Sequence, residues 1–170
     1  INLLTDSLPA IALGLEPHRD EVMGEKPRPR DEGILTRSFL TSVGVEGLVI
    51  ALAAIAAFHT GLRHGEAVGS TMAFATLCLS RLFHGFNCKA ERPVLLTKQF
   101  WDNRWLLGAF AAGAALLGAV LLVPTLEPLF RVTKLSAGLL AAVVGLSAGS
   151  MLVIQLLKAL CARKQAADPH

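Results

Sequence analysis

The sequence predicts an all-α fold, a multi-pass transmembrane helix bundle with one partial and four complete spans. Hydrophobic residues make up 53% of the 170 residues, only 17% are charged, and the mean hydropathy is +0.54. The charges are gathered in short blocks, and the apolar runs between them reach about 20 residues, enough to cross a hydrocarbon core roughly 30 Å thick. Such runs are too long and too uniformly apolar for barrel strands, and helices satisfy their own backbone polar groups in hydrocarbon.

Four complete runs follow one another, and a shorter run precedes them. The complete runs cover 38–58, 68–87, 105–123 and 135–157. Residues 1–15 are expected to be part of a fifth span, because the chain starts with Ile1 inside an apolar run and has no signal-peptide pattern. We therefore expect a carboxy-terminal piece of a longer protein. Its predicted organisation is a partial helix over 1–15, a loop over 16–37, a four-helix support region over 38–157 and a tail over 158–170.

The positions of lysine and arginine predict the orientation of the spans. Twelve of them fall in the blocks 16–37 and 88–104 and in the tail from 158, which share one side if all four complete runs cross. The connections on the other side carry three. Because cytoplasmic loops are enriched in these residues, we expect the two blocks and the C-terminus to be cytoplasmic in a cell membrane. The same loops account for the basic isoelectric point, so a nucleic acid partner is not expected. Membrane lipid is an expected partner, because the runs are predicted to span a membrane.

The first helix carries the strongest sign of a functional site. Asn2, Thr5 and Asp6 lie on one helical face, inside an apolar segment where polar groups are expensive. Pro9 has no N–H to offer the Thr5 carbonyl, so we expect the helix to break or kink there. Carboxylate, amide, hydroxyl and carbonyl oxygens together suit a hard cation such as calcium. The alternative is a structural hydrogen bond between helices.

A second set of polar residues lies in the run 68–87 and in the run before it. Arg81, His84 and Asn87 fall on one face at intervals of three residues. Arg81 lies close enough to the span's end to snorkel to the interface. His84 and Asn87 are predicted to make an interhelical polar contact, with a polar relay for protons as the alternative. Glu46 has no evident partner in the sequence, and we assign it no transport role.

Several motifs resemble P-type ATPases of the sarco/endoplasmic reticulum calcium-pump type, in a bacterial-like form. The segment N-L-L-T-D-S-L-P-A-I-A-L-G-L-E-P resembles the sixth transmembrane helix of these pumps, and M-G-E-K-P-R-P-R-D-E-G-I-L is similar to the loop that follows. T-M-A-F-A-T-L-C-L-S-R-L-F-H-G-F-N resembles their eighth helix, and F-W-D-N-R-W-L-L-G the start of their ninth. These segments occur in the family's order and cover nearly the whole chain.

The resemblance implies roles for individual residues. Asn2 and Asp6 match calcium-coordinating positions, and Thr5 matches a side-chain ligand, so 1–15 would be the ion-site helix. Arg81 stands where the family has a glutamate ligand. A guanidinium cannot coordinate calcium. Arg81 would instead pair with Asp6 as a charge substitute at a lost second ion site. The resemblance then implies one calcium ion per cycle with proton counter-transport. It does not decide whether the preferred ion is calcium or manganese.

The chain alone is not expected to be an active enzyme. The sequence contains neither a D-K-T-G phosphorylation motif nor a nucleotide-binding domain. The resemblance implies that ATP and magnesium act only in the full-length pump, whose upstream transmembrane helices and cytoplasmic domains would be this chain's partners. The alternative function is a non-enzymatic membrane packing or assembly module without an ion site.

Overall fold

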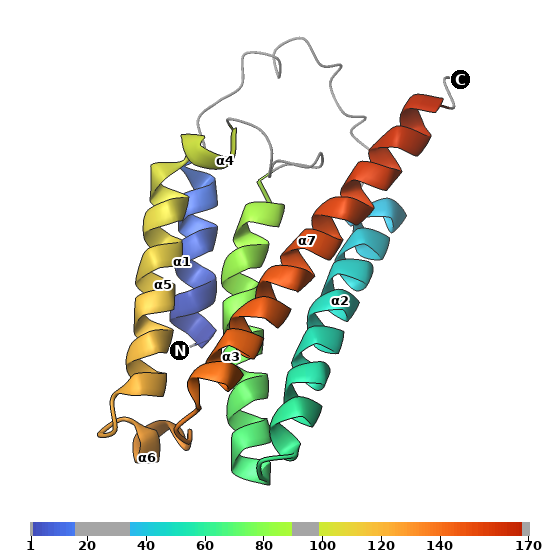
Figure 1. Ribbon diagram of the computed structural model, residues 1–170. Coiled ribbons are helices and arrows are strands. Elements are labelled where there is room, and N and C mark those ends of the chain that lie inside the picture. Colours follow the sequence, from blue (N-terminus) through green and yellow to red (C-terminus); the bar gives the residue numbers. More distant parts are fainter. Residues whose placement is uncertain (1, 16–34, 90–98, 168–170) are drawn as a thin grey trace.

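The computed structural model describes residues 2–15, 35–89 and 99–167, and in this part of the chain all regular secondary structure is helical. This confirms the predicted all-α class (Figure 1). The helices are α1 (Asn2–Gly14), α2 (Arg37–Leu62), α3 (Glu66–Asn87), α4 (Gln99–Asp102), α5 (Arg104–Leu122), α6 (Glu127–Phe130) and α7 (Ala137–Ala167).

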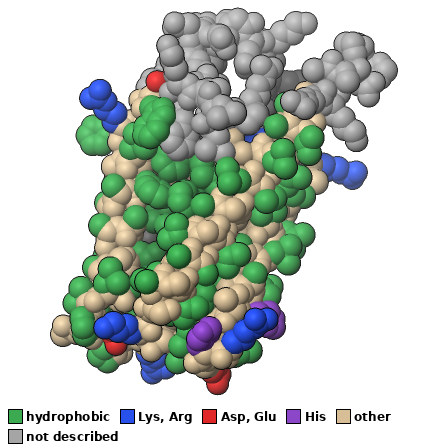
Figure 2. All heavy atoms as spheres, in the orientation of Figure 1, with side chains coloured by type: hydrophobic (Ala, Val, Ile, Leu, Met, Phe, Trp, Pro, Cys, Tyr) green, Lys and Arg blue, Asp and Glu red, His purple; other side chains and the backbone are tan. Residues whose placement is uncertain are grey.

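Three of the described helices are long and apolar enough to cross a membrane. They cover Phe39–Leu62, Arg104–Leu122 and Ala137–Ala162. Apolar side chains also cover the middle of the face in Figure 2, and charged and histidine side chains gather at its lower end. The residue pattern and the helices together show a multi-pass membrane protein.

The predicted span over 68–87, which contains most of α3, differs from the other three complete spans. Helix α3 has 22 residues, about 33 Å at 1.5 Å per residue, so its length suffices for a crossing. It is more polar than the three apolar helices, however, and Thr71, Thr76, Ser80 and Asn87 are all buried. A helix that turns these groups towards protein does not need a uniformly apolar surface.

Helix α3 lies at the centre of the bundle. It contacts α1 and α5, which also contact each other, and it contacts α2 and α7, which form a second neighbouring pair. Small residues allow the closest crossings. A Cβ atom added at Gly61 of α2 would lie only 2.7 Å from the Cα atom of Gly69 in α3. Central α3 therefore connects the two halves of the bundle.

The long helices alternate in direction. The C-terminal end of α1, the start of α2, the end of α3, the start of α5 and the end of α7 lie at one end of the bundle in Figure 1. The α2–α3 turn and the connection through α6 lie at the other end. The helix ends that flank the three basic blocks thus share one side, as the sequence predicts. Most of the 16–37 block itself lies outside the described residues.

Two helices continue past points where the sequence suggests a change. Helix α1 is continuous from Asn2 to Gly14 with Pro9 inside it, so the helix does not break there, and the alternative of a kink at Pro9 stays a prediction. Helix α7 continues to Ala167, so the predicted tail from 158 begins as helix. Residues 158–167 are Lys, Ala, Leu, Cys, Ala, Arg, Lys, Gln, Ala and Ala, most of them strong helix formers without a glycine or proline break. The apolar run ends at 157, but the helix has no reason to end there.

Candidate functional site

An ion pair between α1 and α3 lies at the predicted site. The Nη1 atom of Arg81 is 3.0 Å from the Oδ2 atom of Asp6. Their side chains are 39% and 42% exposed in this chain, so the pair is reachable from outside the described helices. Arg81 therefore extends to a carboxylate on a neighbouring helix, an arrangement that snorkelling alone does not require. The structure brings together the two charged residues that the sequence singled out.

Asn2 and Thr5 belong to the same helix, but their side chains lie outside what the structure describes. The backbone places both residues within one turn of Asp6 on α1. Among the described residues, no group of three or more His, Cys, Asp or Glu side chains could hold a metal ion. The metal-ligand roles of Asn2, Thr5 and Asp6 stay predictions.

The packing of α1 fixes where Asp6 lies. Pro9 is buried against α3, where a Cβ atom added at Gly85 would lie 3.2 Å from the Pro9 Cβ atom. One turn further, Ala12 belongs to an apolar cluster with Phe86 and Leu106. Contacts with α3 and α5 thus hold the half of α1 that follows Asp6.

Asn103 is a positioning residue that the sequence analysis missed. Its Oδ1 atom accepts a hydrogen bond from the Leu106 N–H at 2.9 Å and so caps α5. Its Nδ2 atom donates to the Ala12 carbonyl at 2.8 Å, in the last turn of α1. One buried amide therefore joins the end of α1 to the start of α5. An asparagine directly before an apolar run is a known helix-start signal, so the capping half of this role was visible in the sequence.

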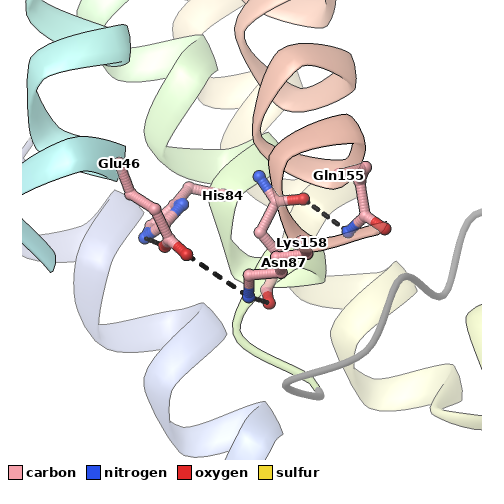
Figure 3. Close-up of polar contacts among 5 residues, drawn as sticks. All are labelled: Glu46, His84, Asn87, Gln155 and Lys158. Carbon is pink, nitrogen blue, oxygen red and sulfur yellow. Dashed lines mark hydrogen bonds and ion pairs between the residues drawn. The ribbon is translucent and has the colours of Figure 1, made fainter. Parts of the chain in front are cut away.

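A polar cluster of five residues joins α2, α3 and α7 near the end of α3 (Figure 3). Its members are Glu46, His84, Asn87, Gln155 and Lys158. The His84 Nε2 atom lies 3.5 Å from Glu46 Oε2, and Lys158 Nζ lies 3.4 Å from Glu46 Oε1. Lys158 also donates to the Asn87 carbonyl at 2.5 Å, and Gln155 Nε2 donates to Asn87 Oδ1 at 2.6 Å.

This polar cluster gives Glu46 the partners that the sequence did not reveal. Both are cationic or able to become so, and they come from two other helices. His84 and Asn87 make the interhelical contacts that were expected of them. Within the described part of the chain, His84 Nδ1 and Asn87 Nδ2 are buried without a hydrogen-bond partner. The alternative role of these two residues as a proton relay stays a prediction.

Fold and site together define a polytopic helical membrane protein with a carboxylate–guanidinium pair between its helices. Residues 1–160 match the family described as "Cation transporting ATPase, C-terminus". The chain therefore belongs to the cation-transporting ATPases, as the resemblance to P-type calcium pumps implied.

Several bacterial relatives are similar over most of the chain. A calcium-transporting ATPase of Bacillus subtilis is 36% identical over 151 residues, which cover 87% of this chain and 17% of that protein. A calcium-transporting ATPase of Listeria monocytogenes is 31% identical over 160 residues, 93% of this chain and 18% of the relative. A calcium-transporting ATPase of Lactococcus lactis is 34% identical over 132 residues, which cover 78% of this chain and 15% of that protein. The chain thus spans less than a fifth of the length of these relatives.

Proposed function

We propose that this chain is the C-terminal membrane part of an ATP-driven calcium pump, in which it supplies part of the ion site and the supporting helices. The observation that carries the proposal is the Asp6–Arg81 pair between helices α1 and α3 of a cation-transporting ATPase. A carboxylate in a transmembrane segment is costly and usually has a function, and hard cations prefer carboxylate oxygens. Calcium as the transported ion is supported by relatives named calcium-transporting ATPases.

Asp6 is the proposed central ligand, with Asn2 and Thr5 on the same helix contributing amide and hydroxyl oxygens. Calcium takes six to eight oxygen ligands, so residues of α1 alone cannot complete the shell. The remaining oxygens are proposed to come from upstream helices of the full-length pump. Under this proposal ATP and magnesium act in the cytoplasmic domains of that pump, and the present chain does not itself hydrolyse ATP.

Arg81 is proposed to replace one transported ion. Its guanidinium is always protonated and has no lone pair with which to bind a metal. At 3.0 Å from Asp6 it supplies a permanent positive charge beside the carboxylate. A second divalent ion at the same place would meet that charge in a medium where repulsion is poorly screened. We therefore propose one calcium ion per cycle, with protons as the counter-ion.

The test is the calcium-to-ATP ratio of the full-length pump in sealed vesicles. We expect a ratio near one, and a ratio near two would show that Arg81 displaces no ion. Arg81→Ala should raise the ratio or permit a second ion to bind, since the substituting charge is gone. A ratio near one that persists in Arg81→Ala would show that another feature limits the count.

The orientation completes the proposal. The ends of α3 and α7 and the start of α5 are proposed to face the cytoplasm, because they flank the basic blocks. A non-enzymatic packing module is the competing function. A full-length protein without calcium-activated phosphorylation would favour that alternative.

A further inference from the structure

We propose that Lys158 is an internal cation that holds α3 at the angle at which Arg81 reaches Asp6. This makes Lys158 a positioning residue for the ion site, acting with Glu46 through α3. The inference rests on the proposed function, since it assigns a consequence to the Asp6–Arg81 pair. Neither the family match nor the names of the relatives assign a role to Lys158 or to the polar cluster.

The Lys158 ammonium group lies between two negative partners from different helices. One is the Glu46 carboxylate of α2, and the other is the backbone carbonyl of Asn87, the last residue of α3. Carbonyls in the last turn of a helix lack intrahelical partners and carry the negative end of the helix dipole. A single lysine of α7 therefore balances both the negative charge of Glu46 on α2 and the partial negative charge at the end of α3.

Because these contacts are largely buried, breaking any of them is costly. The side chains of Lys158 and Glu46 are each 17% exposed, and Asn87 is fully buried. A charge in such a place must keep its partner, because leaving either one alone carries a large desolvation penalty. The hydrogen bond from Gln155 to Asn87 adds a second, directional contact from α7. Rotation of the last turn of α3 would break the contacts that His84 and Asn87 make with α2 and α7, and the Lys158–Glu46 pair between α7 and α2 holds those partners in place.

The same turn of α3 is close to Arg81. His84, which contacts Glu46, follows Arg81 by three residues, about 4.5 Å along the helix axis. Asn87 follows by six residues, about 9 Å. Arg81 contacts α1, whereas His84 and Asn87 contact α2 and α7. The polar cluster thus holds α3 through contacts with α2 and α7. In this way it fixes the direction in which Arg81 points towards α1.

The experiment is a double-mutant cycle between Lys158 and Arg81 in the full-length pump. Lys158→Met removes the ammonium group and keeps much of the side-chain length. We expect it to raise the calcium concentration for half-maximal phosphorylation from ATP by about tenfold, within the usual range of coupling between sites. The maximal phosphorylation level should stay near that of the unmodified pump, because the phosphorylation machinery lies elsewhere.

The cycle separates positioning from general stability. If Lys158 acts through Arg81, Lys158→Met should shift the calcium dependence by less than about twofold in an Arg81→Ala background, because coupled residues are not additive. Equal shifts in both backgrounds would overturn the proposal. Lys134→Met, an exposed lysine before α7 at the other end of the bundle, is the matched control and should leave the calcium dependence unchanged.

A second variant covers the case in which Lys158→Met fails to assemble. Gln155→Leu keeps both charges and removes the hydrogen bond to Asn87. It should shift the calcium dependence in the same direction by a smaller factor, and an unchanged dependence would overturn the positioning role. An unmodified pump without calcium-activated phosphorylation would instead overturn the proposed function. A calcium-activated pump that is insensitive to Lys158→Met would overturn the positioning role alone.

Discussion

Asp6 illustrates how one carboxylate can serve two partners in a membrane. Its Oδ2 atom is 3.0 Å from Arg81, and its side chain is 42% exposed in this chain. A carboxylate has about four lone-pair sites, so accepting one guanidinium N–H leaves capacity for a metal ion. The pair therefore lowers the net charge at Asp6 and leaves oxygen lone pairs for the metal ion that we propose it binds.

Loss of the Asp6 carboxylate should abolish calcium-activated phosphorylation of the full-length pump. Asp6→Ala removes the proposed ligand and leaves the Arg81 charge without its partner, and both effects oppose binding of a cation. The measurement is phosphoenzyme formation from ATP across a calcium titration. Ser7→Ala, the neighbouring residue on α1, is the control and should retain the response. Normal calcium dependence in Asp6→Ala would refute the site assignment.

Asn103 offers a separate test of how α1 is held. Asn103→Ala removes the cap of α5 and leaves the Ala12 carbonyl without its side-chain donor. Loss of a helix cap costs about 0.5–2 kcal/mol, and an unsatisfied buried polar group costs about 1–3 kcal/mol. We expect a lower thermal unfolding midpoint for the full-length pump in detergent. Asn103→Asp keeps the cap acceptor but loses the donor, so its midpoint should also fall below that of the unmodified protein.

Residues differ in how far the sequence could predict their roles. Asp6 and Arg81 stand out because charged groups in apolar segments are rare. The partners of Glu46 could not be predicted, because His84 and Lys158 lie far away in sequence and meet it only when α2, α3 and α7 pack. The link from Asn103 to Ala12 crosses 91 residues, so only its capping half is a local signal.

At the scale of the helices, the crossing of α2 and α3 leaves no room for a side chain at Gly61. A Cβ atom at Gly61 would lie 2.7 Å from the Gly69 Cα atom, a contact with backbone that no rotamer change can relieve. Gly61→Ala should therefore destabilise the bundle by about 1–3 kcal/mol, as overpacking does. Thermal unfolding of the purified full-length pump measures the effect.

The matched control for this crossing is Gly108→Ala in α5. A Cβ atom there meets nothing within 4 Å among the described residues. Because alanine is the better helix former, stability should be unchanged or slightly higher. A Gly61→Ala pump as stable as the Gly108→Ala pump would mean that α2 and α3 do not cross this closely.

Helix identity was easier to predict than helix ends. Each of the four complete apolar runs contains most of one long helix, because membrane thickness sets the length of an apolar run. An apolar run does not give the end of the helix that contains it, and α7 continues beyond the run to Ala167 through further helix formers. Pro9 does not break α1, because a single proline removes few hydrogen bonds and α1 is held by contacts on both sides of it, whereas a kink there stays a prediction.

At the scale of the whole molecule, the distribution of charge and the direction of the helices agree. The ends that flank the basic blocks share one side of the bundle, and the α2–α3 turn and α6 share the other (Figure 1). Because the sequence blocks next to the first set of ends contain twelve lysines and arginines, and the connections at the second set contain three, we expect the first side to be cytoplasmic.

Cysteine labelling tests this orientation. The full-length pump would first be freed of its own cysteines, which in this chain are Cys78, Cys88 and Cys161. His64→Cys then reports on the exposed α2–α3 turn, and Asp102→Cys on the exposed end of α4. In intact cells a membrane-impermeant thiol reagent should label position 64 and spare position 102, and both should react once the membrane is opened. The reverse pattern would invert the topology. It would also place the polar cluster around Lys158 on the outer side of the membrane.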